Sequence, residues 1–385
     1  MSDKEDKKNS SEYIGLSAKT LSPDALKKGS LRLNRPSGRE QLKLGLIMGE
    51  WGHMESEWAR VINGVPGINN IPYTPKQTGM YCTHVWHINR EKAETFAKQF
   101  QVDHVVNHFN DMIGKVDGII IDVFFQMPWT YKLARPYLEA GIPVYIDRPF
   151  TDAVWKAKEM ISLAEKYNTP LWSGSSLEVM YAASEAVRHN PPELITGYET
   201  WSEGEPDYYS HGLHGLWWSY RTAGGGIHAI AHKTKAWNKG GGTSTILYKD
   251  RGHGTFLGKI THYIRDDCII YTKFEGNDRV YRCDYHIDWD SFIWTPMLYK
   301  IQGIFEMGMN GVPDTHDMLL EKMRFFLAGF RSILRENGEF VELDTLDEDW
   351  SVGCPWGQNF MSGMDVYRAY TKLFGTEKGE IRPPG

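Results

Sequence analysis

A short segment near the middle of the chain gathers side chains that could exchange a proton or contact a ligand ring. It contains Tyr208, Tyr209, His211 and His214. An imidazole titrates close to neutral pH, so His214 could act as a general base. The tyrosine rings offer flat faces for stacking, although burial in a core explains aromatic residues equally well. The segment is a candidate reaction site, and a structural, hydrogen-bonded role for His214 stays open.

Polar residues also follow two apolar runs in the first half of the chain. Asp147 and Arg148 follow the run at 143–146, and Gln126 and Trp129 follow the run at 118–123. Arginine has a pKa above about 12 and therefore cannot accept a proton near neutral pH. Arg148 can instead donate hydrogen bonds to negative charge that develops on a reacting oxygen.

These residues lie in a region, residues 41–171, that alternates between apolar strands and amphipathic helices. Strands are predicted at 42–48, 80–86, 105–106, 118–123 and 143–147. Helices are predicted at 55–62, 90–100, 129–140 and 151–167. Nearly continuous apolar runs are typical of parallel strands covered on both faces. The alternation therefore predicts an α/β fold with a right-handed, doubly wound Rossmann sheet.

Such a sheet binds a dinucleotide at the carboxyl ends of its strands, where glycine lets the backbone approach the pyrophosphate. The first turn offers Gly45, Gly49 and Gly52 but no GxGxxG, so an ordinary strand-to-helix turn stays an alternative. After the second strand, His87 or Asn89 could bond the adenosine ribose and Arg90 could pair with a 2′-phosphate. NAD is preferred over NADP because Arg90 is a single basic residue that could simply begin the next helix.

After residue 171 the pattern changes to the period-two alternation of a half-exposed sheet. Strands are predicted at 195–202, 227–237, 243–248, 254–261, 268–274 and 279–285, with helices near 315–336 and 358–374. We therefore predict a C-terminal α+β domain over 172–385 with a mostly antiparallel, open sheet. Residues 1–40 are polar and aperiodic, which predicts a partly disordered tail or an arm that packs on a partner subunit.

Composition narrows the possible partners. Hydrophobic residues make up 41% and charged residues 24%, typical of globular domains, and the net charge of −6 leaves no basic excess for nucleic acid or an anionic membrane. No apolar run approaches the about 20 residues that span a bilayer, and the N-terminus is too polar for a signal peptide. The cysteines form no CxxC pair, which indicates free thiols in the cytoplasm: Cys82, Cys268, Cys283 and Cys354.

Several motifs together resemble one protein family. Residues 138–149 place Glu-Ala-Gly at a helix end and Asp-Arg-Pro after the next strand, and they are accompanied by residues 86–100, the His-Gly-Leu-His at 211–214 and the Gly-Thr-Phe at 254–256. In this order the chain resembles the glucose–fructose oxidoreductase/inositol dehydrogenase (Gfo/Idh/MocA) family over roughly residues 42–375. The resemblance implies a Rossmann domain, a second domain whose sheet often mediates homo-oligomers, and NAD(P)-linked redox chemistry on a sugar, cyclitol or related secondary alcohol.

The resemblance also implies roles for single residues. It places Asp147 and Arg148 near the nicotinamide ribose and the substrate, and it matches His214 to the family's catalytic histidine. Arg148 replaces the family's usual lysine, and Ser210 and Trp217 occupy positions where acidic residues often flank the histidine. Because arginine cannot accept a proton, His214 is predicted to be the general base and Arg148 an electrostatic positioner.

We therefore expect an NAD(P)-dependent oxidoreductase that transfers hydride between a nicotinamide and a secondary hydroxyl of a sugar, a glycoside (for instance at C3) or a cyclitol. The predicted cofactor-binding residues are Gly49, Gly52, His87, Arg90, Gln126, Asp147 and Arg148. The predicted substrate-binding residues are Trp129, Tyr208, Tyr209 and His211. A glycoside-cleaving enzyme with tightly bound NAD and a non-catalytic Rossmann-like binding protein stay open. A zinc site at His211, His228 and His232 is not expected, because no His-Glu-x-x-His or CxxC accompanies them.

Overall fold

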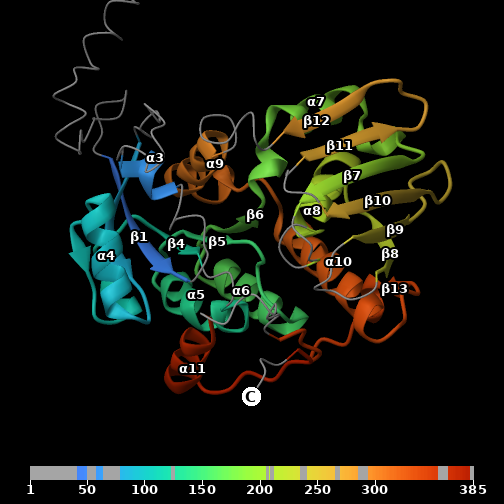
Figure 1. Ribbon diagram of the computed structural model, residues 1–385. Helices are drawn as coiled ribbons and strands as arrows, with labels where there is room; N and C mark the ends of the chain where they lie inside the picture. The colour runs from blue at the N-terminus through green and yellow to red at the C-terminus, as the bar shows by residue number, and fades with distance from the viewer. Residues whose placement is uncertain are drawn as a thin grey trace, which may run out of the picture.

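A six-stranded parallel sheet forms the centre of the first domain, at the left of Figure 1. The computed structural model describes residues 41–49, 58–63, 79–122, 126–204, 208, 212–234, 241–264, 269–284, 294–353 and 363–381. The predicted arm at 1–40 lies outside the described residues, as do the predicted site residues Gly52, Tyr209 and His211.

The strand order of this sheet is β3-β2-β1-β4-β5-β6, the order of a dinucleotide-binding doubly wound fold. All neighbouring strands are parallel. Their bounds are β1 Leu42–Met48, β2 Met80–Trp86, β3 His104–Val105, β4 Gly118–Asp122, β5 Val144–Asp147 and β6 Leu171–Gly174. The predicted α/β class is confirmed. The predicted domain boundary at residue 171 falls at the first residue of β6.

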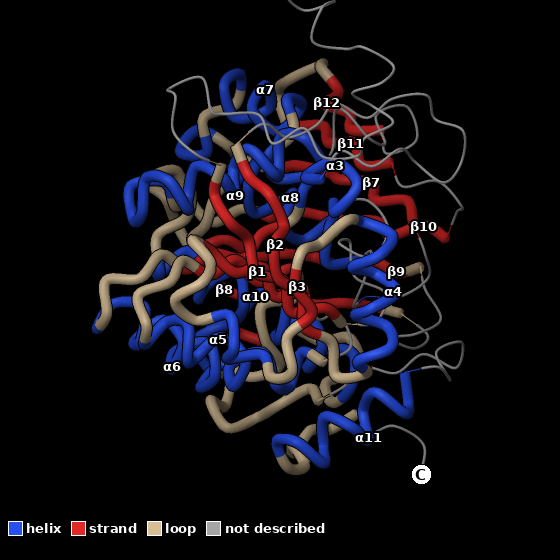
Figure 2. The backbone as a smooth tube through the Cα atoms, turned by 90° about the vertical axis from the view of Figure 1, so that its left-hand side faces the viewer, coloured by secondary structure: helices blue, strands red, loops and turns tan. Residues whose placement is uncertain are grey.

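Helices cover both faces of this sheet, which explains why its strands are almost continuously apolar. One face packs against α3 (Ala59–Asn63), α4 (Arg90–Phe100) and α9 (Trp294–Met307). The other face packs against α5 (Thr130–Glu139) and α6 (Val154–Lys166). Figure 2 shows α4 and α5 on opposite sides of the strands.

A seven-stranded sheet forms the second domain, at the right of Figure 1. Its order is β12-β11-β7-β10-β9-β8-β13, and every neighbouring pair is antiparallel except β7 and β10. The bounds are β7 Tyr198–Gly204, β8 Ile227–Lys233, β9 Gly242–Tyr248, β10 Leu257–Ile264, β11 Ile269–Phe274, β12 Val280–Asp284 and β13 Val341–Glu342. The predicted, mostly antiparallel sheet is confirmed.

Helices α8 (Leu213–Ala223) and α10 (His316–Leu334) pack on one face of this second sheet, with α7 (Tyr181–His189) beside β12. Of the helices in this half, α7, α8 and α9 had no counterpart in the sequence prediction. In α8 every residue except Arg221 is buried, so the apolar periodicity that marks a surface helix is absent.

The chain returns to the first domain near its end. Helix α11 (Gly363–Phe374) lies beside α5, where Tyr370 contacts the rings of Trp86 and Trp129. Lys156 of α6 is buried and pairs with Asp152 at 2.8 Å and with Glu377 at 3.1 Å. The C-terminal segment therefore packs on the Rossmann layer rather than with the second sheet, which departs from the predicted division at residue 171.

Candidate active site

The carboxyl ends of the parallel strands collect most of the predicted cofactor residues. Gly49 follows β1, and its N–H donates to the carbonyl of Asp122 at the end of β4 (2.7 Å). Gly45 instead lies inside β1, where a Cβ atom would meet Ile119 Cδ1 at 2.8 Å. Gly45 therefore serves sheet packing, and of the two described glycines only Gly49 belongs to the first turn.

At the end of β2, His87 and Arg90 have different surroundings. His87 is buried, and its Nδ1 lies 2.9 Å from Asn89 N and 3.0 Å from Asn89 O, so the backbone engages this nitrogen. Arg90 begins α4 and is exposed; its Nε bonds Glu94 Oε1 at 2.7 Å, and its guanidinium also bonds Asn107. The charge of Arg90 is therefore already matched by Glu94, which favours NAD over NADP.

Gln126 follows β4, and its side-chain amide makes no hydrogen bond with the described residues. The residue is fully buried, and neither its Nε2 nor its Oε1 has a hydrogen-bond partner among the described residues. A buried amide without partners costs roughly 1–3 kcal/mol, so native proteins seldom keep one without a ligand or water to meet it. An amide that offers two donors and an acceptor at this edge fits the polar groups of a bound dinucleotide.

Asp147 and Arg148 follow β5 and are both 5% exposed. The Tyr145 hydroxyl donates to Asp147 Oδ1 at 3.2 Å and to the Gly174 carbonyl at 2.9 Å, which ties the ends of β5 and β6 together. Asp147 pairs with Gly174 in the register of these strands, so Arg148 and Ser175 are the next residues on neighbouring strands.

His214 reaches this edge from the second domain. It lies in the first turn of α8, is 3% exposed, and its Nδ1 is 2.6 Å from the Ser175 hydroxyl. Because Ser175 directly follows β6, this contact brings His214 to the strand ends that carry Arg148. Through a serine that sequence reasoning missed, the structure thus links His214 to the end of β6, the strand that pairs with the one preceding Arg148.

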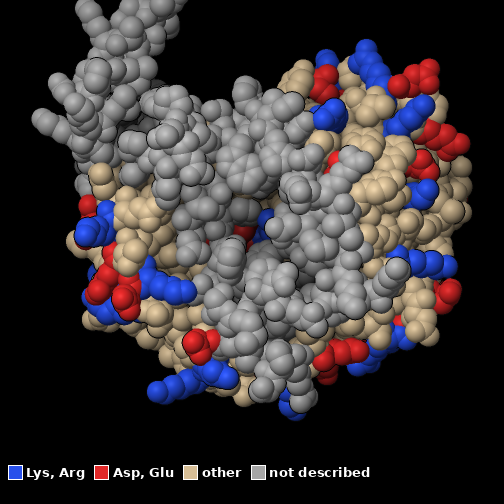
Figure 3. All heavy atoms as spheres, in the orientation of Figure 1, with Lys and Arg blue, Asp and Glu red and all other residues tan. Residues whose placement is uncertain are grey.

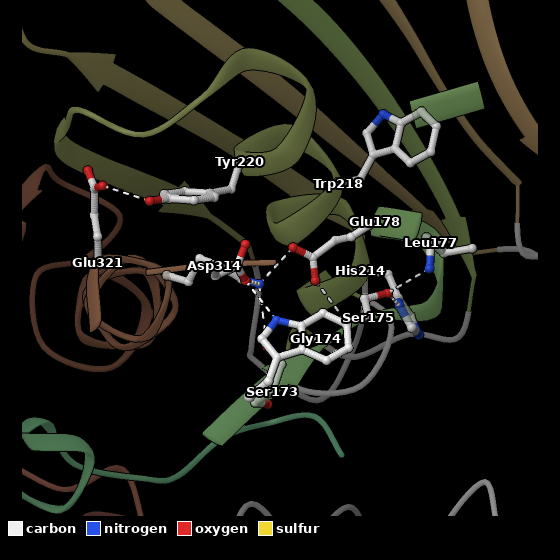
Figure 4. A network of polar contacts seen from close by, with 12 residues as sticks. Ser173, Gly174, Ser175, Leu177, Glu178, His214, Trp218, Tyr220, Asp314 and Glu321 are labelled. Atoms are coloured by element: carbon white, nitrogen blue, oxygen red, sulfur yellow. Dashed lines mark hydrogen bonds and ion pairs between the residues drawn. The ribbon is translucent and has the colours of Figure 1, made fainter. Parts of the chain in front are cut away.

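A buried charge cluster lies behind Ser175 (Figure 4). Glu178 accepts from Ser175 N–H at 2.6 Å and pairs with Lys322 at 2.7 Å; Lys322 also pairs with Asp314 at 3.0 Å, which accepts from Trp172 Nε1 at 2.9 Å. Burial raises the pKa of Glu178 to about 7, although Lys322 opposes the shift. Burial works against the charge of Lys322, but Asp314 and Glu178 keep the pKa of its ammonium above the ordinary value.

Of the residues that sequence reasoning missed, Ser175 and Glu178 have a recognisable sequence signal and Lys322 has none. Ser175 and Glu178 have the spacing of a capping box, and they form one on the 3₁₀-helix Ser176–Val179. That spacing after a strand could have marked the turn. Lys322 lies 144 residues from Glu178 along the chain, and no local pattern connects them.

Two predicted substrate residues serve packing instead. Trp129 is fully buried, donates its indole N–H to the Gly375 carbonyl at 3.1 Å and contacts Tyr370. Tyr208 is 4% exposed, stacks on Phe326 and donates to its carbonyl at 3.4 Å. Their faces and polar atoms are occupied within the protein, so the predicted contacts of Trp129 and Tyr208 with substrate are not supported.

The histidines weighed as zinc ligands also diverge. A register shift between Ile227 and Ala229 interrupts the alternation of β8. His228 is partly exposed, 3.6 Å from Glu342, whereas His232 is buried, with its Nδ1 2.7 Å from Ser244 Oγ. Within the described part of the chain, no three His, Cys, Asp or Glu side chains are grouped as metal ligands. Nor is any helix there long and apolar enough to cross a membrane.

The first domain matches a known protein family in sequence. The family model GFO_IDH_MocA, described as "Oxidoreductase family, NAD-binding Rossmann fold", matches residues 64–175. No curated protein matches the chain.

Solved structures share the fold over most of the chain. Scyllo-inositol dehydrogenase from Lactobacillus casei, with bound NAD(H) and scyllo-inositol, is 12% identical with a TM-score of 0.62, over 80% of this chain and 100% of that one. GenD2 from gentamicin A biosynthesis, in complex with NAD, is 13% identical with a TM-score of 0.62, over 84% and 99%. An oxidoreductase from Agrobacterium radiobacter, in complex with NAD+, L-tartaric acid and magnesium, is 16% identical with a TM-score of 0.59, over 79% and 99%.

These similarities confirm the resemblance seen in the motifs and the fold that it implied. NAD, the cofactor predicted from the sequence, is the one that the family model names. Over residues 64–175 the chain is thus similar to the Gfo/Idh/MocA oxidoreductases, with their NAD-binding Rossmann fold.

Proposed function

We propose that this protein is an NAD-dependent dehydrogenase that acts on a secondary hydroxyl of a sugar, a glycoside (for instance at C3) or a cyclitol. The observation that carries the proposal is the contact of His214 with Ser175 at 2.6 Å, next to the strand end that carries Arg148. It supports a pairing of a group that can accept a proton with a permanent cation at the edge where Rossmann sheets bind dinucleotides. Dehydrogenase neighbours of the same fold support the substrate class.

The residues divide the chemistry among themselves. Bound NAD supplies the hydride acceptor, and the Gln126 amide together with Gly49 and Asp147 would hold it. His214 would take the hydroxyl proton, because an imidazole is the side chain best suited to general-base catalysis near neutral pH. Arg148 would stabilise negative charge on the substrate oxygen, and its burial excludes water that would weaken this interaction. The family's usual lysine could serve both roles, whereas here Arg148 can serve only the second.

The first experiment is to denature the purified protein, identify any released nucleotide, and screen sugars, glycosides and inositols for a change in nicotinamide absorbance. His214→Gln should lower kcat by at least about 100-fold, the range of general-base catalysis, with NAD affinity nearly unchanged. Wild-type turnover in His214→Gln contradicts the proposal. Arg148→Ala should also lose turnover, and Arg148→Lys should retain part of it.

The same screen separates the alternative functions. Cleavage of a glycoside without net NADH production would identify an enzyme that oxidises its substrate only transiently. If no nucleotide is released on denaturation and none binds on titration, the chain is a binding protein rather than a dehydrogenase.

A homo-oligomer that forms through the second sheet is part of the proposal. The face of this sheet away from α8 and α10 carries Trp201 stacked on Tyr271 (5.1 Å) and the exposed side chains of Leu257 (54%), Tyr263 (42%) and Val280 (55%). Light scattering should show an oligomer that Tyr263→Asp dissociates; a monomeric wild type contradicts this expectation. A cytoplasmic location is also proposed, supported by the unbridged, buried thiols of Cys82 and Cys283.

The distribution of surface charge also bears on the class of substrate. On the face drawn in Figure 3, lysine and arginine side chains alternate with aspartate and glutamate around the described rim, without one sign of charge prevailing. Mixed charge of this kind suits a small, uncharged substrate better than steering of a polyanion.

A further inference from the structure

The imidazole of His214 has a defined hydrogen-bond partner. Ser175 Oγ lies 2.6 Å from His214 Nδ1, and the two residues are 1% and 3% exposed. Water therefore cannot readily replace the serine as a partner. A histidine can present either ring nitrogen to a reactant, and the bond at one nitrogen decides which one is left for chemistry.

Ser175 is itself held in place by the turn that follows β6. Its hydroxyl oxygen accepts from Leu177 N–H at 3.2 Å, while its own N–H donates to Glu178 Oε2 at 2.6 Å. One lone pair of the hydroxyl is thus engaged, and the other can accept from His214 Nδ1–H. In that arrangement the proton of neutral His214 lies on Nδ1, and Nε2 has the lone pair that a general base needs.

Glu178 is in turn fixed by Lys322 (2.7 Å), which also binds Asp314 (3.0 Å). The cluster holds two carboxylates against one ammonium when Glu178 is ionised. Negative charge behind Ser175 favours a positive imidazole in front of it. In this chain the cluster supplies what Ser210 and Trp217 cannot, because neither can be acidic near neutral pH.

We propose that Ser175 is the positioning residue of His214: it holds Nδ1 so that Nε2 takes the substrate hydroxyl proton, and Glu178 and Lys322 fix Ser175 in turn. In this step the O–H bond breaks and its proton moves to Nε2. The C–H bond of the carbon that bears this hydroxyl breaks as well, its hydride passes to oxidised NAD, and a C=O bond forms. The resulting imidazolium keeps its Nδ1–H bond to Ser175. This inference rests on the proposed role of His214 as the general base.

The test combines kinetics with the tautomeric state of the imidazole. We would label the full-length protein with ¹⁵N-histidine and assign the His214 signals by comparison with His214→Gln. Wild type should show neutral His214 protonated on Nδ1. Ser175→Ala should show a mixture of tautomers and a kcat lowered by about 10- to 100-fold, the range seen when a residue that orients a metal-binding histidine is removed. The KM for substrate should change much less than kcat.

Two controls separate positioning from general damage. Ser175→Thr keeps the hydroxyl and should restore both the tautomer and most of the turnover. Ser219→Ala removes another buried serine hydroxyl from α8, one that bonds Thr200 at 3.3 Å, and should leave both readouts unchanged. If Ser175→Ala does not fold, Ser175→Cys keeps the side-chain size with a weaker acceptor and should show the same losses in part.

The outcomes distinguish this inference from the proposed function. An inactive His214→Gln beside a Ser175→Ala variant with wild-type kcat and tautomer overturns the positioning role and leaves the dehydrogenase proposal standing. A fully active His214→Gln overturns both. Loss of kcat in Ser175→Ala without any change in tautomer also overturns the inference, because it indicates a role for Ser175 that does not pass through His214.

Discussion

Replacing Lys322 with methionine tests whether the buried cluster behind Ser175 is held together by charge. The side chains of Lys322, Glu178 and Asp314 are 0%, 4% and 6% exposed. Methionine has a similar length but leaves two carboxylates buried without their cation. Removing one partner of a buried ion pair typically costs about 3–5 kcal/mol, because solvent cannot compensate the charge that is left. We expect a loss of this size in the free energy of unfolding at pH 7.

The loss should depend on pH in a defined direction. Burial holds the pKa of Glu178 near about 7 in the wild type, against the opposing effect of Lys322. Without that cation the pKa of Glu178 rises further, so the folded variant keeps a proton that the unfolded chain has lost. Folded stability then falls as pH rises, by up to about 1.4 kcal/mol per unit. The deficit of Lys322→Met should therefore be larger at pH 8.5 than at pH 6.

Urea unfolding followed by tryptophan fluorescence measures the effect at both pH values. Lys249→Met is the matched control: Lys249 pairs with Asp344 at 3.0 Å, but both side chains are more than half exposed. Exposed pairs contribute at most about 1 kcal/mol, so this variant should stay close to wild type. A deficit of Lys322→Met no larger than that of Lys249→Met, at either pH, would refute the reasoning.

Three further perturbations follow from single contacts. Gln126→Met removes a buried amide without partners, so it should leave the stability of the NAD-free protein unchanged or higher and weaken NAD binding about tenfold by calorimetry, as loss of roughly one hydrogen bond would. Gly329→Ala would place Cβ 1.6 Å from the Tyr208 hydroxyl oxygen and should lower the free energy of unfolding in urea by about 1–3 kcal/mol. Adding Tyr208→Phe should recover part of this loss, whereas losses that simply add contradict the contact. Burial lowers the pKa of His262 to about 4, so the free energy of unfolding of the wild type should fall as the pH drops from 6.5 to 4. His262→Gln should make this fall smaller, and an unchanged fall contradicts the reasoning.

Much of the first domain could be predicted from local patterns. The run at 42–48 and the helix at 90–100 have the predicted bounds, because parallel strands are apolar throughout and α4 keeps its apolar residues on one face. The nicotinamide cofactor followed from the same alternation and from the motif order. Prediction failed for α8, whose residues are buried on nearly all sides and show no helical stripe.

The candidate site likewise has a part that the sequence predicted and a part that it did not. The sequence by itself made His214 and Arg148 the candidate catalytic residues, through the family resemblance and the proton chemistry of imidazole and guanidinium, and their roles stay predictions. Only the tertiary structure decided that Ser175 contacts His214, that Lys322 pairs with Glu178 from a distant helix, and that Trp129 and Tyr208 are used in packing. The physical reason is that a side chain's chemistry is a property of the residue, whereas its partners are set by contacts between segments that lie far apart in the chain.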